Sequence, residues 1–565
     1  MSINGALNLG ANALTTAQAA LQVTGNNIAN LGNPNYSREV AVTTDLPDQQ
    51  LSPGVFIGTG VDLSGIQRQV DQSINSRLTS ATSDYEAANT TQQLSGQIET
   101  IFNALGSNSL DTQLTTFTND WSQLANNPTD TAQRQVVIQD GQSLAQQFNG
   151  LGSQLDSMQT TVGSQLSSLA ANASQLSQQI ASLNQQIATS QGAGGQNSQL
   201  LDQRDAAVQS LAQLVNVQTI PQANGTENVY IGSEPLVVGT TADSLTVQQS
   251  QVNGQPNYSL TFASNGGPVQ ATSGQIGATL AAQTQLNNVQ TQFNSLAGGL
   301  IFGLNSIYSS GQGLNGVTSV TASNQVQSST SPLNSAATDL PFQPVNGSFV
   351  LTTTNTQTNL SSSTLVPVNL TGQPGDTTLN SLAASLNAIP NVSATIQGGK
   401  LTIASTDPNV QISFSQDSSH ALAALGVNTF FSGSDAASIA VNPITAANPN
   451  LLAAAQNGDP GDNSNALAIA SFSSTNQSVL GNQSWTTAYN AMIGGIATTS
   501  AQAQSDTQST QDIQQTLQAQ QQSVSGVNID QETVNMLMQQ RSYQGAAMFI
   551  STVNQMMTSL LAITI

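Results

Sequence analysis

Apolar residues recur at alternating spacings of four and three through the first 30 positions of the chain. A repeat of 3.5 residues over almost four heptads is typical of a helix that packs lengthwise against another helix. Gly32, Asn33 and Pro34 end the pattern. The sequence therefore predicts an N-terminal helix with one seam. The seam positions are Ile3, Leu7, Gly10, Leu14, Ala17, Leu21, Thr24 and Ile28.

Two further segments carry a helical apolar repeat. The stretch from Val162 to Ile187 alternates spacings of four and three without error, which predicts a long coiled-coil-like helix. Near the C-terminus, apolar residues line one side of a helix that starts at Asp530. That stripe is the expected complement of the N-terminal seam. It contains Leu537, Met538, Phe549, Val553, Met556 and Leu560.

The centre of the chain has a different pattern. Short apolar runs separated by turns between residues 215 and 262 predict a small β unit. Residues 316–460 hold ten of the 18 prolines and several strand candidates, with one helix expected at Leu379–Leu386. Helices are also expected over residues 66–120, 276–308 and 466–522.

These elements predict an α+β fold. We expect an elongated multi-domain protein in which long coiled-coil-like helices from both termini enclose inserted, mainly β domains. An ordinary helical bundle with a β insertion is the alternative that the pattern leaves open. The expected domains are an assembly helix and loop (1–60), a helical core with a β unit at about 215–265 (61–315), an outer β domain (316–460), a helical return (461–525) and a C-terminal assembly helix (526–565).

Composition limits the possible partners. Only 6% of the 565 residues are charged, against the usual ~25%. The formal net charge of −22 argues against nucleic acid and against an anionic membrane surface. The chain has no cysteine, no apolar run long enough for a transmembrane helix and no visible cleavable signal peptide.

Few residues suggest chemistry. His420 is the single histidine and Lys400 the single lysine, and we expect both in turns. Asp202 and Asp205 flank Arg204, which we interpret as an exposed ion network of small energetic value. We therefore predict no catalytic residue, no cofactor and no metal site.

A short motif follows the N-terminal seam. The segment Thr24–Asn30, followed by Pro34, Tyr36, Ser37 and Arg38, resembles the N-terminal signature of flagellar rod, hook and hook-associated proteins. An asparagine on such a seam can hydrogen-bond a neighbouring subunit's backbone and fix the register. The candidate residues here are Asn26, Asn27 and Asn30.

Other segments narrow the resemblance to the FlgK family of first hook-associated proteins. The end of the chain, from Ser525 through Gln540–Gln544 to Leu561, is similar to that family's C-terminus. Residues 197–205, 421–431 and 461–463 are similar to further family segments, in family order. Residues 320–370 match no family pattern, and many charged helix positions of the family are glutamine here.

This resemblance implies a structural subunit and not an enzyme. Such a protein is exported unfolded through the flagellar type III apparatus, without a cleaved signal peptide, and assembles outside the cell as a ring between hook and filament. The implied partners are the hook protein, a second junction protein, the filament cap protein and an export chaperone. Arg541 and Tyr543 complete the expected assembly interface. We expect both chain ends to be disordered in the free protomer and to order on assembly.

Three other functions were weighed against this one. Another axial protein, such as a hook subunit or flagellin, fits the terminal helices but not the segment Leu425–Phe431 or the ending Leu560–Ile563. A cell-wall hydrolase needs a catalytic carboxylate or metal triad in residues 316–460, where neither a His pair nor a Cys occurs. A secreted adhesin fits the Thr-rich centre but not the paired terminal helices.

Overall fold

The structure is a computed structural model that describes residues 3–102, 106, 109–192, 197–252 and 254–563. It confirms the α+β class, with helices at both ends and β-rich insertions between them. The chain divides into two compact units. The first comprises Met1–Leu94, Val162–Gln283 and Gln502–Ile565, and the second comprises Ser95–Thr161 and Thr284–Ala501.

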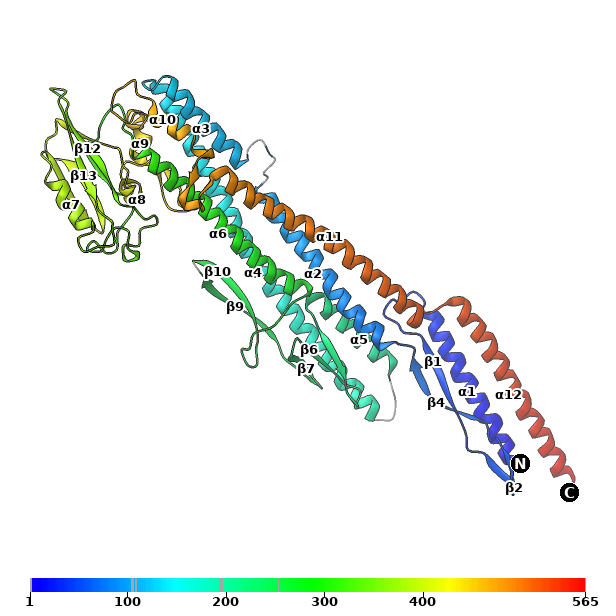
Figure 1. The fold of residues 1–565 in the computed structure, drawn as a ribbon. Coiled ribbons are helices and arrows are strands. Elements are labelled where there is room, and N and C mark those ends of the chain that lie inside the picture. Colours follow the sequence, from blue (N-terminus) through cyan, green and yellow to red (C-terminus); the bar gives the residue numbers. More distant parts are fainter. Residues whose placement is uncertain (1–2, 103–105, 107–108, 193–196, 253, 564–565) are drawn as a thin grey trace. The chain divides into compact units, whose positions relative to one another are not determined.

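The two ends of the chain meet in the first unit. Helix α1 (Ile3–Ala29) lies beside helix α12 (Ile529–Ile563), as Figure 1 shows. Strands β1 (Glu39–Asp45) and β4 (Val61–Arg68) form an antiparallel ribbon that packs on α1. The short strands β2 (Gln49–Ser52) and β3 (Val55–Ile57) form a hairpin within the connection between them.

The rest of the first unit combines helices with two small sheets. It contains α5 (Ser198–Leu214) together with parts of α2 (Gln72–Phe102), α4 (Thr131–Gly192), α6 (Gly274–Tyr308) and α11 (Trp485–Ser525). The first sheet has four strands in the order β5 (Gln218–Pro221), β6 (Glu227–Ile231), β7 (Glu234–Val238) and β8 (Thr241–Ala242). The second sheet pairs β9 (Leu245–Val252) with β10 (Gln255–Phe262).

The predicted seam from Val162 to Ile187 lies inside α4, and most of its positions are buried. Together with α5 and the strands it forms one apolar core, which includes Leu166, Leu211, Val229 and Phe262. Asn197 starts α5 by accepting a hydrogen bond from Leu200 N at 3.3 Å. The long helix and the small β unit are therefore confirmed as predicted.

The second unit contains a β module with its own core. Strands β11 (Ser319–Thr321), β15 (Lys400–Ser405) and β14 (Val392–Gln397) form one sheet, in that order. Strands β13 (Ser361–Val368), β12 (Gly347–Asn355) and β16 (Val410–Ser415) form the other. Helix α7 (Leu379–Asn387) begins with a capping box between Thr378 and Ser381 and lies where a helix was predicted.

Helices and short elements complete the second unit. They are α3 (Leu110–Asn126), α8 (Ala421–Leu425), α9 (Pro443–Ala447), α10 (Ser464–Ala470) and the two-residue strands β17 (Phe431–Ser432), β18 (Ala440–Val441), β19 (Asn476–Gln477) and β20 (Gln483–Ser484). Phe117 and Trp121 of α3 pack against Phe430, with ring centroids 5.3 and 5.9 Å from that of Phe430. None of the helices in the described ranges is both long and apolar enough to cross a bilayer.

Two helix predictions were wrong in part. Residues 66–68 belong to β4, because the ladder with β1 continues to the pair Glu39–Arg68. The predicted helix over 466–522 is interrupted between α10 and α11. Gly481 and Asn482 adopt left-handed backbone conformations (φ 65° and 61°), which end the preceding turn, and Ser484 then caps the start of α11.

Candidate assembly site

The buried face of α1 consists of small and polar residues. A Cβ added to Gly10 would lie 2.6 Å from Ile550 Cγ1 and 3.1 Å from a carbon of Phe549, so the absent side chain permits close contact with α12. The fully buried positions of α1 are Gly10, Thr16, Ala17, Ala20, Val23, Thr24 and Asn27.

The large apolar residues of the predicted α1 seam are only half-buried. Leu14, Leu21 and Ile28 are of intermediate exposure, whereas Ala20 and Asn27, one position earlier, are buried. Ile3 and Leu7 are also intermediate. The buried face is thus turned by about one residue from the expected seam, and each leucine keeps part of its surface open.

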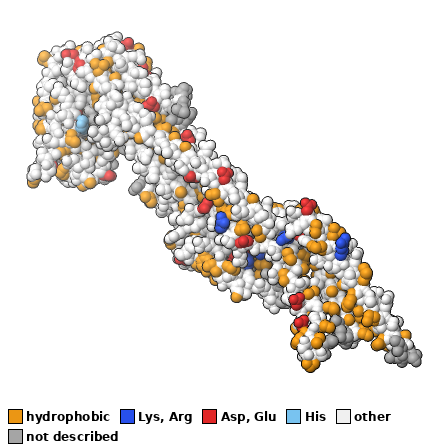
Figure 2. All heavy atoms as spheres, turned by 45° about the vertical axis from the view of Figure 1, so that its right-hand side comes forward, with side chains coloured by type: hydrophobic (Ala, Val, Ile, Leu, Met, Phe, Trp, Pro, Cys, Tyr) orange, Lys and Arg blue, Asp and Glu red, His pale blue; other side chains and the backbone are white. Residues whose placement is uncertain are grey.

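Helix α12 has two different faces. Towards the protomer it buries Glu532, Ala546 and Val553. Of the predicted interface residues, Val553 is buried on this face, and Phe549 lies at its edge, in contact with α1 at Gly10 but still 40% exposed. The other face carries large exposed apolar side chains, and Figure 2 shows hydrophobic side chains gathered over this end of the first unit. The exposed residues are Val534, Leu537, Met538, Met548, Phe549, Met556, Leu560 and Leu561. Arg541 and Tyr543 are exposed as well.

Asn27 joins three segments of the chain. Its Nδ2 donates to Glu39 O at 2.9 Å and to Glu532 Oε2 at 3.1 Å. Its Oδ1 accepts from the Tyr36 hydroxyl at 2.7 Å and from Glu39 N at 3.0 Å. The backbone that Asn27 bonds thus belongs to the same chain, which locks α1, β1 and α12 together in the protomer.

The residues around Asn27 form a compact polar cluster. Burial raises the pKa of Tyr36, and the nearby carboxylates of Glu39, Asp202 and Glu532 raise it further, so the hydroxyl stays a donor. Arg38 lies 4.0 Å from Glu532, and its backbone N–H donates to Ser525 O at 2.9 Å. The sequence alone does not indicate these contacts of Glu532. The signal it does carry is a pair of acidic residues, Asp530 and Glu532, in the first turn of a helix with only three charged residues.

Asn26 joins the edge of this cluster, and Asn30 lies beside it. Asn26 Nδ2 donates to the Tyr36 hydroxyl at 3.3 Å and to Glu39 Oε2 at 3.4 Å. Asn30 Nδ2 donates back to Asn26 O at 3.0 Å, which closes the last turn of α1. At the start of α12, Asn528 Oδ1 accepts from Asp530 N at 3.0 Å and acts as the N-cap.

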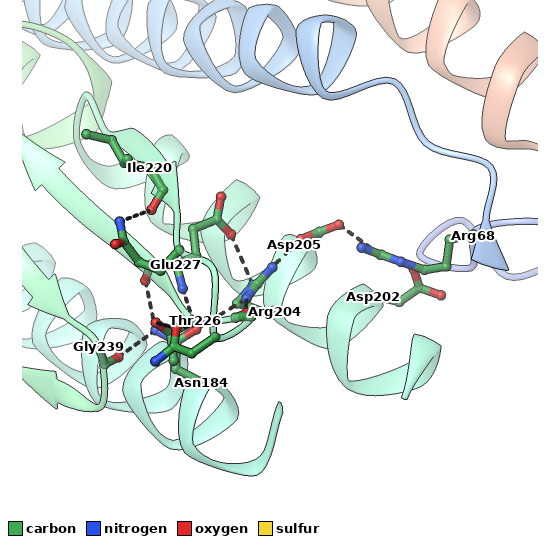
Figure 3. Close-up of polar contacts among 12 residues, drawn as sticks. Arg68, Asn184, Asp202, Arg204, Asp205, Ile220, Thr226, Glu227 and Gly239 are labelled. Atoms are coloured by element: carbon green, nitrogen blue, oxygen red, sulfur yellow. Dashed lines mark hydrogen bonds and ion pairs between the residues drawn. The ribbon is translucent and has the colours of Figure 1, made fainter. Parts of the chain in front are cut away.

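A second polar cluster ties β4 to α5 (Figure 3). Arg68 donates through one guanidinium nitrogen to Asp202 at 2.6 Å and to Asp205 at 2.9 Å. Asp202 also accepts from Ser37 N at 3.1 Å. The acidic pair flanking Arg204 therefore serves Arg68, a partner from another segment that the sequence did not indicate.

Arg204 itself points to the four-stranded sheet (Figure 3). Its Nε lies 3.0 Å from Glu227 Oε2 and its NH1 donates to Gly225 O at 2.7 Å. Asn184 supports the same turn by donating to Glu227 O and Gly239 O. Arg204 is 7% exposed, so the expected exposed network is wrong. Asp202 and Arg204 are buried, whereas Asp205 is half-buried.

The other candidate residues have structural positions. Lys400 follows the Gly398–Gly399 turn of a hairpin, as predicted. His420 precedes α8 with φ 53° and packs edge-on to Phe302 at 6.2 Å. No group of three or more potential metal ligands occurs in the part of the chain that the structure describes.

Comparison with known families relates the chain to a class and then to a family. Residues 518–563, which include α12, match the C-terminal family of the flagellar basal body rod proteins FlgEFG. The end of the chain is therefore similar to the C-terminus of flagellar rod proteins. Residues 95–321 match the helical domain of the flagellar hook-associated protein FlgK. The chain is similar to the FlgK family of flagellar hook-associated proteins, and these similarities support a structural role in the flagellum.

Relatives match along nearly the whole chain. Flagellar hook-associated protein 1 of Escherichia coli K12 is 25% identical over 574 residues, which cover 97% of this chain and 98% of the relative. The Salmonella typhimurium protein of the same name is 25% identical over 565 residues, with the same coverage of each chain. The structure of the hook junction protein FlgK from Burkholderia pseudomallei matches with a TM-score of 0.53 at 19% identity, over 80% of this chain and 100% of that one.

Proposed function

We propose that copies of this chain form a ring that joins the flagellar hook to the filament, and that the α1–α12 pair holds the ring together. The observation that carries the proposal is the second apolar face of α12. Leu537, Met538 and Met556 are each more than half exposed, although α12 already pairs with α1. An apolar surface of this kind is typical of an interaction site.

Charge supports the same proposal. Helix α1 has no charged residue, and α12 has three in 35 residues. Identical helices with so little charge repel one another weakly, because like-charge repulsion is the main electrostatic penalty of self-association. The half-buried Leu14, Leu21 and Ile28 of α1 offer a second apolar surface for a neighbouring copy.

The proposed partners, location and domain roles rest on the similarity to the FlgK family. The proposed partners are the hook protein on one side, a second junction protein on the other, and transiently a filament cap protein and an export chaperone. The proposed location is outside the cell, after export without a cleaved signal peptide. Residues 1–60 and 526–565 act as assembly segments and 316–460 as an outer domain. The role is structural and requires no catalytic residue.

A substitution in α1 tests the proposal. Leu21→Asp places a charge on the half-buried face, and we expect hooks without filaments and flagellin lost to the medium. Gln22→Asp is the matched control, because Gln22 is exposed one position away, and filaments should be retained. The main thermal transition in circular dichroism should stay within a few degrees of the wild type, since α1 lies outside the large apolar cores. Normal filaments with Leu21→Asp would contradict the proposal.

We further propose that the terminal pair orders on assembly. An isolated helix pair that buries few side chains is marginal, because most helical stability comes from tertiary packing. Hydrogen exchange in the free protomer and in isolated flagella provides the measurement. Strong protection of residues 3–29 and 529–563 in the free protomer would exclude ordering on assembly, and would leave the junction role untouched.

A further inference from the structure

The exposed face of α12 carries two opposite charges among its apolar side chains. Asp530 and Arg541 are both exposed, and within the described residues neither belongs to an ion pair. The positions three and four residues away from either one are uncharged, so no partner lies one helical turn away. Helix α1, against which α12 packs, offers no charge at all.

The two charges are spaced by a whole number of turns. Eleven residues separate them, which at 3.6 residues per turn places them about 20° apart around the helix and about 16 Å apart along it. They therefore share one side of α12. The distance is too long for a direct contact within one copy.

The same spacing recurs among the exposed apolar residues of this face. Leu537 is followed after 11 residues by Met548, and Met538 is followed after 11 residues by Phe549. All four side chains are at least 40% exposed. If a second copy of α12 lies parallel to the first and is displaced by 11 residues, Asp530 of one copy lies opposite Arg541 of the other. The same displacement places the exposed apolar residues opposite one another. A copy at zero displacement brings Asp530 beside Asp530 and Arg541 beside Arg541, which is repulsive.

We infer that neighbouring copies of this chain pack their α12 helices in parallel with a stagger of three helical turns, and that an ion pair between Asp530 of one copy and Arg541 of the next sets this stagger. The inference rests on the proposed ring, since it takes a second copy of this chain, pointing in the same direction, as the occupant of the exposed face. The apolar residues supply contact area and the charges supply the register.

Charge exchange tests the register. Arg541→Asp and Asp530→Arg each place like charges opposite one another, and we expect at least a fivefold loss of hooks that retain a filament. The double variant Asp530→Arg/Arg541→Asp restores opposite charges and should recover filament retention to within twofold of the wild type. The amount of each variant in the medium controls for export. Single reversals without effect, or no recovery in the double variant, would overturn the stagger.

Cross-linking gives an independent measurement in the cysteine-free chain. Asp530→Cys/Arg541→Cys in isolated flagella should give a ladder of covalent oligomers with a short thiol cross-linker, because sulfurs about 16 Å apart cannot be joined within one copy. Ala547→Cys/Thr558→Cys has the same separation on a different side of the helix, where both residues are exposed, and should cross-link at least fivefold less. Equal cross-linking of both pairs would overturn the inference.

The outcomes separate this inference from the proposed function. If Leu21→Asp abolishes filament retention while charge reversal and cross-linking show no register, the ring stands and the stagger is wrong. If Leu21→Asp has no effect either, the proposed function itself fails. If the cysteine variant cross-links to a different protein and not to itself, the exposed face serves another partner and the inference is refuted.

Discussion

The β module of the second unit and the terminal helix pair of the first differ in where their apolar side chains go. In the β module, Phe349, Leu351 and Leu379 are completely buried within a single core. In α12, large residues such as Met548 remain 68% exposed while the small Ala546 is buried. One region completes its core within the chain, and the other leaves an apolar face exposed.

The difference extends to how each region uses polar groups. The β module places threonines and serines on its solvent face, where Thr352 and Ser363 pair across strands at 2.9 Å. The terminal pair instead buries its polar groups, with Asn27 and Glu532 at 1% and 2% exposure. A buried, fully paired amide fixes one arrangement of segments, so the pair is specified by hydrogen bonds where it lacks a large core.

The largest expected effect is a cavity in the closed core. Phe349→Ala removes a ring from the centre of the β module and should lower the free energy of unfolding by roughly 3–5 kcal/mol. Calorimetry on the purified protein measures the change. Leu360→Ala is the matched control, because Leu360 is 73% exposed and should change stability by less than about 0.5 kcal/mol. Equal losses for both would show that the module is not the closed core described here.

A smaller effect is expected at the close contact of the terminal pair. Gly10→Ala adds a methyl group 2.6 Å from Ile550 Cγ1, and overpacking of this kind costs roughly 1–3 kcal/mol. Gly25→Ala is the control on the same helix, since nothing lies within 4 Å of the added Cβ, and it should stabilise α1 by about 0.5–1 kcal/mol.

The two glycine variants are compared through the protease sensitivity of residues 3–29 in assembled flagella. Cleavage should increase for Gly10→Ala and fall slightly for Gly25→Ala. The opposite order would mean that α1 and α12 are not in contact at Gly10.

The sequence predicts the β module more completely than it predicts the terminal helix pair. Spans such as α4, α6 and α7 follow from local periodicity and caps, and the strands of the β module lie where short apolar runs occur. The buried face of α1 could not be predicted from hydrophobicity. Ala20 is buried in preference to Leu21 because a small residue allows the close approach that Gly10 also requires.

Long-range polar contacts lie outside what a single sequence can show. Asn27 and Glu532 are 505 positions apart, and Arg68 and Asp202 are 134 apart. Their pairing depends on how the segments fold back. The predictable signal is the rarity of charge. In a chain with 6% charged residues, a charge on a nearly uncharged helix is worth testing for a partner from another segment, as found at Glu532, or from another copy, as we infer at Arg541.

The smallest expected effect on stability concerns a buried carboxyl group in the second unit. Burial, together with the hydrogen bond and negative charge of Asp140 on α4, raises the pKa of Asp120 on α3 to about 7. Below about pH 3 both the folded and the unfolded state hold the proton. Between about pH 4 and pH 7 the folded state keeps a proton that the unfolded state releases, so stability contributed by this group falls as the pH rises.

Asp120→Asn removes that dependence, because an amide needs no proton and can donate to Asp140. We expect the melting temperature of the variant to exceed that of the wild type at pH 8, by an amount corresponding to about 1–2 kcal/mol, and to match it near pH 3, below the pKa of the unfolded carboxyl. Asp140→Asn should act in the same direction, because either substitution removes one of the two interacting carboxyl groups. A gain of equal size at both pH values would mean that the two carboxyls do not interact. Helices α3 and α4 would then be held together by packing alone, without a proton shared between Asp120 and Asp140.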